Sequence, residues 1–560
     1  MARPISCRYE LSARLRVVTA LAVGSGAEER GVDLAVARDG RGRPYVPGTS
    51  LAGALRAWSL LKGDQDRERR LWGWQSPDDA AQGWASRIWV EDAALELPQE
   101  AMMEEIRDGI AIDRRTGAAA RGFKYERAVV PAGTTLALRL GCAVEPAHEA
   151  EALALLQEIR AGLRTGRLWL GAARSRGLGR LELVEGSDRL LRERLGTREE
   201  MLAALRRRVR RKPSEGERGQ GEEVPETTEV RLAEPAELRL RLHWRPLGPL
   251  MVRASADGLS VDSLPLTAAV DGTRALLLPG SSIKGALRAR AERILRTLLE
   301  ARPAPADLPG QLLPHRLIGW MFGSAPTDQP AGHEAGATPQ PGLAAVWVAD
   351  CLSRSRVEAD LWAQVESARR LGQADLGTAG EGDRQAQPGA EPSLREVLDR
   401  SPLLRAWDPA IHVAIDRWTG GAAEERLFSL LEPHGVGWGP IEIVVHLERL
   451  PAELHRPALA LLLLVLDDLA RGELPLGFAT NRGLGDLEVE TMEIEVQGAT
   501  SLGWLAGRHS IGGRGLLAAL GSARPAELAA LRDTWGSWLA AHGRPASPPP
   551  GAPTDGRKAP

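Results

Sequence analysis

The sequence predicts an α+β fold in which one domain occurs twice in tandem, each copy a ferredoxin-like arrangement of a sheet and helices. Two observations predict it. Five motifs recur in the same order along the chain, and each copy begins with an alternating strand and continues through helix, strands, helix and strand. The 560 residues are 43% hydrophobic and 26% charged, which is the composition of a globular protein and excludes a wholly disordered or fibrous chain.

Five pairs of similar segments carry the repeat. The distance between the two members of a pair only grows along the chain, from 232 residues at Pro47 and Pro279 to 306 at Gly177 and Gly483, so the second copy contains insertions. The pairs are PYVPGTSLAGALRAW (44–58) and LLLPGSSIKGALRAR (276–290), LWGWQS (71–76) and WMFGSA (320–325), WVEDAAL (89–95) and WVADCLS (347–353), IDRRTGAAA (112–120) and IDRWTGGAA (415–423), and LGAARSRGLGRLEL (170–183) and LGFATNRGLGDLEV (476–489).

The regular elements follow from local patterns. Apolar residues alternate at 9–15 and at 236–242, which is typical of half-buried β-strands. Helices are predicted after both PG[ST]S turns, with Thr49, Ser50, Ser281 and Ser282 as N-caps. A second helix in each copy, at 149–163 and 457–470, precedes the late Gly-rich motif and a final strand.

Composition divides the chain into domains and connecting segments. The linker runs from a basic cluster into an acidic stretch with Pro and Gly, and a Gly/Ala/Gln/Pro-rich insertion accompanies the largest jump in the distance between repeats. The predicted boundaries are 1–200 for the first domain, 201–234 for the linker, 235–500 for the second domain with a disordered insertion near 371–394, 501–543 for a C-terminal helical extension, and 544–560 for a disordered tail.

Charge and cysteine content exclude several classes of protein. The net charge of −2 gives no overall electrostatic attraction to nucleic acid. Only five of the 72 basic residues are lysines, so the chain has a general bias towards arginine, and the abundance of arginine is weak evidence for RNA binding. No run approaches 18 apolar residues, and the first residues read as a strand rather than a signal peptide, so a cytoplasmic protein with no membrane partner is expected. Three cysteines far apart in sequence exclude a disulfide framework and a CxxC zinc site.

Two kinds of segment are candidates for contacting phosphate. The PG[ST]S turns combine small hydroxyls with a helix N-terminus. Lys284 lies in the first turn of the second such helix, where its charge opposes the helix dipole, so a nearby anion would explain why a lysine occurs there. The equivalent residue of the first copy is Ala52. The RGLG loops place an arginine before glycines that let a ligand approach the backbone. The alternative to phosphate binding is a plain helix cap for the PG[ST]S turns and a tight β-turn for the RGLG loops. The candidate RNA contacts are Gly48, Thr49, Ser50, Arg56, Arg174, Arg176, Gly177, Gly179, Gly280, Ser281, Ser282, Lys284, Arg288, Asn481, Arg482, Gly483 and Gly485.

These motifs resemble the RAMP superfamily of CRISPR-associated proteins, and each copy resembles the backbone subunit of type III effector complexes. The resemblance covers about 1–190 and 235–495 and implies two ferredoxin-like (RRM-like) RAMP domains, each with an inserted β-hairpin. Two fused domains are similar to tandem subunits of type III-D and single-polypeptide systems. The family places hairpins that insert across the guide–target duplex at the IDRxTG motifs, here Asp113, Arg114, Arg115 and Thr116, and Asp416, Arg417, Trp418 and Thr419.

The resemblance also implies an active site in each copy. Members that cleave target RNA carry an aspartate in a loop before the PG[ST]S turn, which corresponds to Asp33 and Asp262 here. The implied activity is a metal-dependent endoribonuclease, in which the carboxylate acts as base or holds Mg²⁺ or Mn²⁺ while a target 2′-OH attacks its own phosphate. Asp39, Asp257 and Asp271 are competing loop aspartates, since such residues commonly cap turns.

The expected partners are a CRISPR guide RNA, complementary single-stranded target RNA, and other type III subunits: a large subunit, further RAMP subunits and a small helical subunit. Unlike many backbone subunits, the chain lacks cysteines for a zinc finger, so no zinc is expected. Two alternatives stay open. One is a purely structural RNA-binding subunit in which Asp33 and Asp262 are turn residues. The other is a guide-processing endoribonuclease using a His or Tyr base, which the duplex-inserting hairpins disfavour.

Overall fold

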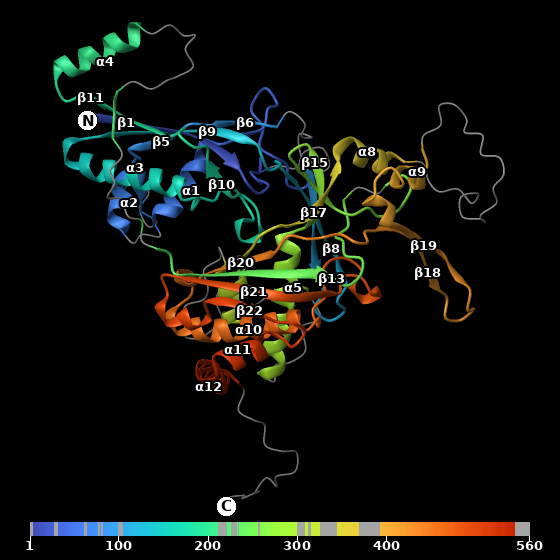
Figure 1. Cartoon of the computed structure of the whole chain (residues 1–560). Helices are drawn as coiled ribbons and strands as arrows, with labels where there is room; N and C mark the ends of the chain where they lie inside the picture. The colour runs from blue at the N-terminus through green and yellow to red at the C-terminus, as the bar shows by residue number, and fades with distance from the viewer. Residues whose placement is uncertain are drawn as a thin grey trace, which may run out of the picture.

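The computed structural model shows two α/β bodies, with the N-terminal part of the chain in the upper body and much of the C-terminal half in the lower one, while residues 351–368 and 394–398 lie at the right (Figure 1). The structure describes residues 4–26, 32–60, 64–76, 79, 82–98, 105–210, 221–225, 232, 234–255, 258–299, 308–311, 315–324, 344–368 and 392–543.

The first body is built on a sheet whose central strand is the opening strand β1. β1 pairs antiparallel with β9 on one side and with β11 and β10 on the other, and its alternate residues are buried. Its elements are β1 (Cys7–Val17), β2 (Tyr45–Val46), α1 (Gly48–Leu60), α2 (Gln65–Trp72), β3 (Trp74–Gln75), β4 (Gly83–Trp84), β5 (Ile88–Val90), β6 (Ala93–Glu96), β9 (Thr135–Val144), η1 (Pro146–His148), α3 (Glu149–Arg164), η2 (Arg174–Arg176), β10 (Leu181–Leu183), β11 (Arg189–Arg194), α4 (Arg198–Arg210) and β12 (Glu222–Glu223).

The second body repeats this plan around β13, which lies between β20 and β21. Helix α10 is buried on nearly all sides because it packs against α5, α7, α11, α12 and β21. The elements are β13 (Glu237–Pro246), β14 (Thr267–Val270), β15 (Thr273–Leu278), α5 (Gly280–Leu298), α6 (Leu308–Gln311), α7 (Arg316–Phe322), β16 (Val346–Val348), β17 (Cys351–Glu358), α8 (Ala359–Ser367), α9 (Leu394–Leu398), η4 (Leu404–Ala406), β20 (Ile441–His446), η5 (Leu447–Arg449), η6 (Ala452–Leu454), α10 (His455–Ala470), η7 (Thr480–Arg482), β21 (Leu487–Gln497), η8 (Thr500–Leu505), β22 (Gly507–Ser510), α11 (Leu516–Ala523) and α12 (Pro525–His542).

Each body carries a two-stranded hairpin at its IDRxTG motif. The first hairpin is β7 (Glu105–Ile112) with β8 (Ala119–Val129), and the second is β18 (Asp408–Ile415) with β19 (Ala422–Glu432). The first runs down beside the second body, whereas the second projects away from both bodies (Figure 1).

The mixed α/β architecture with tandem repeats agrees with the sequence analysis, while the specific ferredoxin-like arrangement stays a prediction. The expected opening strands, both pairs of helices and both hairpins are present. The boundaries differ in two places. Helix α4 and strand β12 lie in the expected linker, and β12 extends the first sheet through β11. Strand β22 lies in the expected helical extension and pairs with β21, because its backbone completes the edge of the second sheet.

Two expected disordered segments fall largely outside the described residues. The tail at 544–560 lies entirely outside them, as does 371–391 of the insertion. The last residues of that insertion are ordered, because Ser393 forms a capping box with Glu396 and Leu394 is buried at the start of α9. Within the described ranges, no helix combines the length and apolarity needed to cross a lipid bilayer.

The expected N-caps of the two PG[ST]S helices are wrong. Helices α1 and α5 begin at Gly48 and Gly280, so the hydroxyl residues lie inside the first turn. The first backbone N–H of each helix instead donates to an aspartate from a neighbouring segment, Gly48 N to Asp92 Oδ1 at 2.7 Å and Gly280 N to Asp350 Oδ1 at 2.8 Å. Both aspartates end a WVxD motif, which is the repeated sequence signal that could have identified them.

The glycines of these turns are required by packing. A Cβ on Gly280 would lie 2.3 Å from the carbonyl oxygen of Val348, and one on Gly48 would lie 2.2 Å from that of Val90. These glycines let the helix N-terminus approach the adjacent strand, so they do not indicate an open phosphate cradle.

A pair of glycines in one helix tests this packing role. Gly280→Ala should destabilise the protein by about 1–3 kcal/mol, since a helix–strand contact must move apart. Gly285→Ala, one turn later with open space around its Cβ, should be neutral or stabilise by up to about 1 kcal/mol through helix propensity. Urea unfolding of the two variants measures the difference, and equal midpoints would contradict the packing role.

Candidate nucleic-acid interface

The late Gly-rich loop of the first body packs against the second body, and we call this junction the seam. A Cβ on Gly177 would lie 2.7 Å from the backbone N of Asp350. Trp169 of the first body meets Trp347 of the second edge-to-face, with ring centroids 4.7 Å apart. The seam therefore joins the RSRGLG motif of one repeat to the WVxD and PGSS motifs of the other.

Part of the seam is neutralised by ion pairs from the first hairpin. Arg107 Nη1 lies 2.6 Å from Asp350 Oδ2, and Arg114 Nε lies 2.7 Å from Glu292 Oε2. All four side chains are nearly buried. Opposite charges in low-dielectric surroundings compensate one another, so this part of the seam needs no further ligand.

Another part of the seam gathers cations with no such compensation. Among the described residues, no member forms an ion pair with a carboxylate. Lys284 Nζ donates to Ser175 Oγ at 3.0 Å, Arg176 Nη1 donates to the Tyr125 hydroxyl at 3.3 Å, and Arg449 stacks on Trp347. We call this group the seam cluster: Arg127, Arg174, Arg176, Lys284 and Arg449.

Burial lowers the pKa of four members of the seam cluster, Arg127, Arg174, Lys284 and Arg449. Burial, with the positive charges of Arg176 and Arg288 nearby, lowers the pKa of Lys284 well below its usual value. An uncompensated cation is costly to bury, so the arrangement would be relieved by an anion at the seam.

The lowered pKa of Lys284 predicts how RNA binding depends on pH. A phosphate beside Lys284 would favour its charged form and raise its pKa, so binding should take up a proton and weaken as pH rises above the pKa of the free protein. Arginine stays charged, so Lys284→Arg should lose this dependence. RNA titrations between pH 6 and 9 measure it, and an identical pH profile for both proteins would contradict the assignment.

The same reasoning gives a stability effect in the RNA-free protein. Because the folded-state pKa is lower than the unfolded one, the unfolded chain binds more protons between these two values. The contribution of Lys284 to the free energy of unfolding should therefore rise with pH through that window. The rise should stop at a pH of about 10.4, which is the ordinary pKa of a lysine side chain.

The two Gly-rich loops differ in their surroundings. In the second copy, Arg482 lies over the ring of Phe428 at 4.7 Å, and a Cβ on Gly483 would meet open space, unlike one on Gly177. Gly179 and Gly485 have positive φ and would place a Cβ within 2.2 Å of the carbonyl oxygens of Leu170 and Leu476, so they close a tight turn. Asn481 is exposed in the second loop.

Two of the expected RNA contacts have internal partners. Arg56 Nη2 donates to the Gly73 carbonyl at 3.0 Å, and Arg288 Nη1 donates to the Gly323 carbonyl at 3.1 Å. These carbonyls follow the C-terminal turns of α2 and α7, so both arginines complete helix ends. Arg127 and Arg449 were not among the expected contacts, because nothing local distinguishes them among the chain's many arginines.

The acidic loops of the two copies have the same geometry. Asp33 Oδ2 accepts from the backbone N of Glu126 at 2.7 Å, and Asp262 Oδ2 accepts from the backbone N of Ser429 at 2.7 Å. In each copy the residue after the aspartate forms a parallel bridge to the second strand of the hairpin, Leu34 to Arg127 and Ser263 to Leu430. The structure thus places Asp33 and Asp262 at equivalent positions at the bases of the hairpins.

The competing aspartates have ordinary turn positions. Asp39 Oδ1 accepts from the backbone N of Arg41 and of Arg43, and these bonds lower its pKa. Asp271 has φ of 46° in the turn between β14 and β15. Asp257 lies outside the described residues.

The aspartates of the IDRxTG motifs shape the hairpin tips. Asp113 Oδ1 accepts from the backbone N of Arg115 and Thr116, and Asp416 Oδ1 accepts from that of Trp418 and Thr419. These bonds lower the pKa of both aspartates. At the second tip the Trp418 side chain is 96% exposed and Arg417 is also exposed, whereas Arg114 at the first tip is docked on Glu292.

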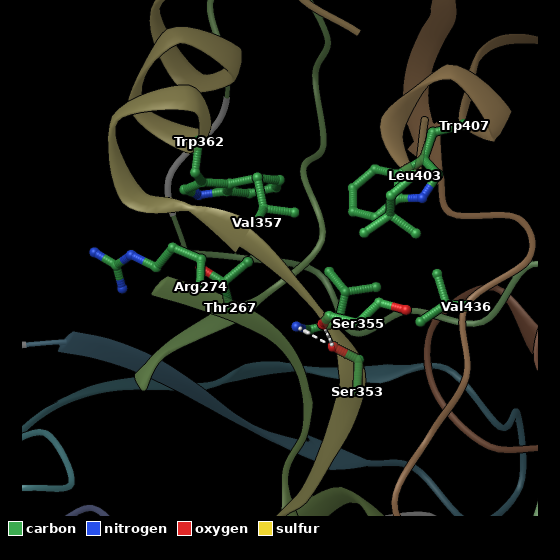
Figure 2. Close-up of a pocket in the computed structure, with 10 residues that line it drawn as sticks. Thr267, Arg274, Ser353, Ser355, Val357, Trp362, Leu403, Trp407 and Val436 are labelled. Carbon is green, nitrogen blue, oxygen red and sulfur yellow. Dashed lines mark hydrogen bonds between the residues drawn. The ribbon is translucent and has the colours of Figure 1, made fainter. Parts of the chain in front are cut away.

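A small hollow in the second body is lined by Trp362 and Trp407, whose rings are arranged edge-to-face, with Ser353 and Ser355 below them (Figure 2). It leaves no room for a water molecule, so it is core packing near the base of the second hairpin. Among the described residues no three His, Cys, Asp or Glu side chains are placed to hold a metal ion. In the described part of the chain, neither Asp33 nor Asp262 belongs to a set of three such side chains, so the residues around them do not fit a resident metal.

Two copies of a mixed α/β domain, with a cluster of cations where the copies meet, define a tandem repeat protein of the mixed α/β class. The model of the RAMP superfamily matches residues 14–182 and 265–488, which together cover more than half of the sequence, and the chain belongs to this superfamily. Membership supports its classification as a CRISPR-associated RNA-binding subunit. No curated protein matches the chain.

Proposed function

We propose that this protein is a guide-RNA-binding backbone subunit of a type III CRISPR RNA-targeting complex in the cytoplasm. The observation that supports it most is the seam cluster. The chain as a whole carries a net charge of −2, yet five cations collect at one junction without an ion-paired carboxylate among the described residues. A nucleic-acid backbone supplies the phosphates that such a junction needs.

The expected mode of binding is independent of sequence. Arginine and lysine side chains contact phosphates, which carry no sequence information. The chain has only four Phe and three Tyr, so base stacking of the kind used by RNA-recognition sheets has few candidates beyond tryptophan. The guide would therefore be held by its backbone, leaving its bases available for pairing with a target RNA.

We also propose that the complex cleaves its bound target RNA at an acidic loop. The carboxylate would accept the proton of a target 2′-OH, the 2′-oxygen would bond to the adjacent phosphorus, and the 5′-oxygen would leave and take a proton from water. The products are a 2′,3′-cyclic phosphate and a 5′-hydroxyl. Each copy places an aspartate at the base of a hairpin, Asp33 beside Glu126 and Asp262 beside Ser429, and the exposed Asp33 is the carboxylate that we propose acts as the base.

Salt-dependent RNA binding tests the binding proposal. The affinity of the full chain for a single-stranded guide RNA should fall steeply between 50 and 200 mM salt, with a slope of about −0.7 per neutralised phosphate, or roughly −3 for four to five contacts. An affinity independent of salt would contradict phosphate binding at the seam.

The alternatives separate by substrate. A complex that cuts labelled guide-complementary RNA, and not labelled repeat RNA, supports target cleavage; the reverse supports guide processing. An intact target supports the purely structural subunit. Adding EDTA to the cleavage reaction tests the expected need for Mg²⁺ or Mn²⁺, which would then be supplied by solution and bound with the RNA phosphates.

A further inference from the structure

We propose that the two acidic loops have different roles: Asp33 is the reactive carboxylate, and Asp262 with Ser429 is a clamp that holds the base of the second hairpin. This inference rests on the proposed cleavage of target RNA for the role of Asp33. It predicts one cut per bound chain instead of two.

Hydrogen bonding distinguishes the two carboxylates. Asp33 is exposed and, among the described residues, accepts a single hydrogen bond, from the backbone of Glu126. Asp262 is half-buried, and its Oδ2 accepts from both the backbone N and the hydroxyl of Ser429, at 2.7 and 3.0 Å. The backbone N of Asp262 donates back to the Ser429 hydroxyl at 3.1 Å, which closes the contact in both directions.

The Ser429 contacts leave Asp262 less available to a substrate than Asp33. The backbone N and the hydroxyl of Ser429 both occupy Oδ2, so the Ser429 hydroxyl takes up space on this oxygen that a substrate proton would need. In the first copy the position of Ser429 is taken by Glu126, whose side chain is directed to Lys124 at 3.2 Å and donates nothing to Asp33.

The two hairpins explain why only one copy needs a clamp. The first hairpin is braced along its length by the second body, through Arg107 on Asp350, Arg114 on Glu292, and Glu105, which accepts from Ala269 N at 2.6 Å. The second hairpin projects outwards (Figure 1), and its face is open, with Ile415 56% and Leu427 66% exposed. Its described contacts lie at its base, where Asp262 and Ser429 are found.

Asparagine variants separate charge from geometry. An Asn side chain keeps an oxygen that accepts hydrogen bonds but loses the charge and the basicity. Asp33→Asn in the full chain, loaded with guide RNA and complementary target, should slow cleavage at least 100-fold, the usual contribution of a general base. Asp262→Asn should leave both the fragment pattern and the rate unchanged.

Alanine variants test the clamp itself by hydrogen exchange. Asp262→Ala and Ser429→Ala should both accelerate amide exchange in residues 408–432, because the hairpin base loses its acceptor or its donor, whereas Asp262→Asn should not. Asp33→Ala should leave exchange in the first hairpin near the unmutated level, since the second body still braces it.

The outcomes are distinct. Loss of a cut in Asp262→Asn, or two cuts by the unmutated chain, would overturn the division of roles. Unchanged exchange in Asp262→Ala would overturn the clamp. An intact target with the unmutated complex would refute cleavage and the role of Asp33, and the exchange measurement would still decide the clamp independently.

Discussion

Lys284→Met should make the RNA-free protein more stable and its RNA binding weaker. Methionine fills similar space without a charge, so the cost of burying an uncompensated cation disappears, and a gain on the order of 1–4 kcal/mol is expected from comparable replacements. RNA affinity should fall about tenfold or more, since a charge-assisted hydrogen bond contributes about 1.5–3 kcal/mol. Thermal unfolding and RNA titration measure the two effects.

Two control variants sharpen this prediction. Lys124→Met removes an exposed lysine paired with Asp108 and should change stability by no more than about 0.5 kcal/mol. Arg532→Ala removes an exposed arginine that pairs with Asp533 on α12, at the end of the second body away from the first body (Figure 1), and should leave RNA affinity unchanged. A loss of stability in Lys284→Met would mean that the lysine is compensated in the free protein, which contradicts the seam cluster.

Glu292→Ala should release the first hairpin and destabilise the protein by about 3–5 kcal/mol. Two guanidinium groups converge on this buried carboxylate, Arg114 Nε at 2.7 Å and Arg288 Nε at 2.8 Å, and removing it leaves both without a counter-charge. The tip of the hairpin contains several arginines, so trypsin should cleave the variant there earlier than the unmutated protein.

The matched control is Glu442→Ala, which removes a half-exposed carboxylate that also pairs with an arginine. Its effect should not exceed about 1 kcal/mol, because water already solvates both groups. Equal destabilisation by the two variants, or unchanged trypsin cleavage in Glu292→Ala, would show that the hairpin is not docked through this ion pair.

Local elements were predictable from the sequence because their signals are local. The alternation at Tyr9 and Leu11 predicts β1, and the doubled IDRxTG motifs predict two hairpins at equivalent positions. The equivalent geometry of Asp33 and Asp262 follows the repeat as well. Repetition helped most, since two independent segments supported each assignment.

The seam was not predictable, because it depends on contacts between residues far apart in sequence. Ser175 and Lys284 are separated by 109 positions, and only the folded chain brings them within 3.0 Å. Among 67 arginines, the sequence does not distinguish Arg449, which has no ion pair with a described carboxylate, from Arg107, which binds Asp350. The helix caps were missed for the same reason, since Asp350 caps α5 from another segment.

The most direct test of the seam as the RNA site is a density map of the full chain bound to its guide RNA. We expect a backbone phosphate within hydrogen-bonding distance of Lys284 Nζ and the guanidinium of Arg176, with the neighbouring Arg107–Asp350 pair intact. A map in which the RNA follows another surface, and the seam cluster contacts no phosphate, would contradict it.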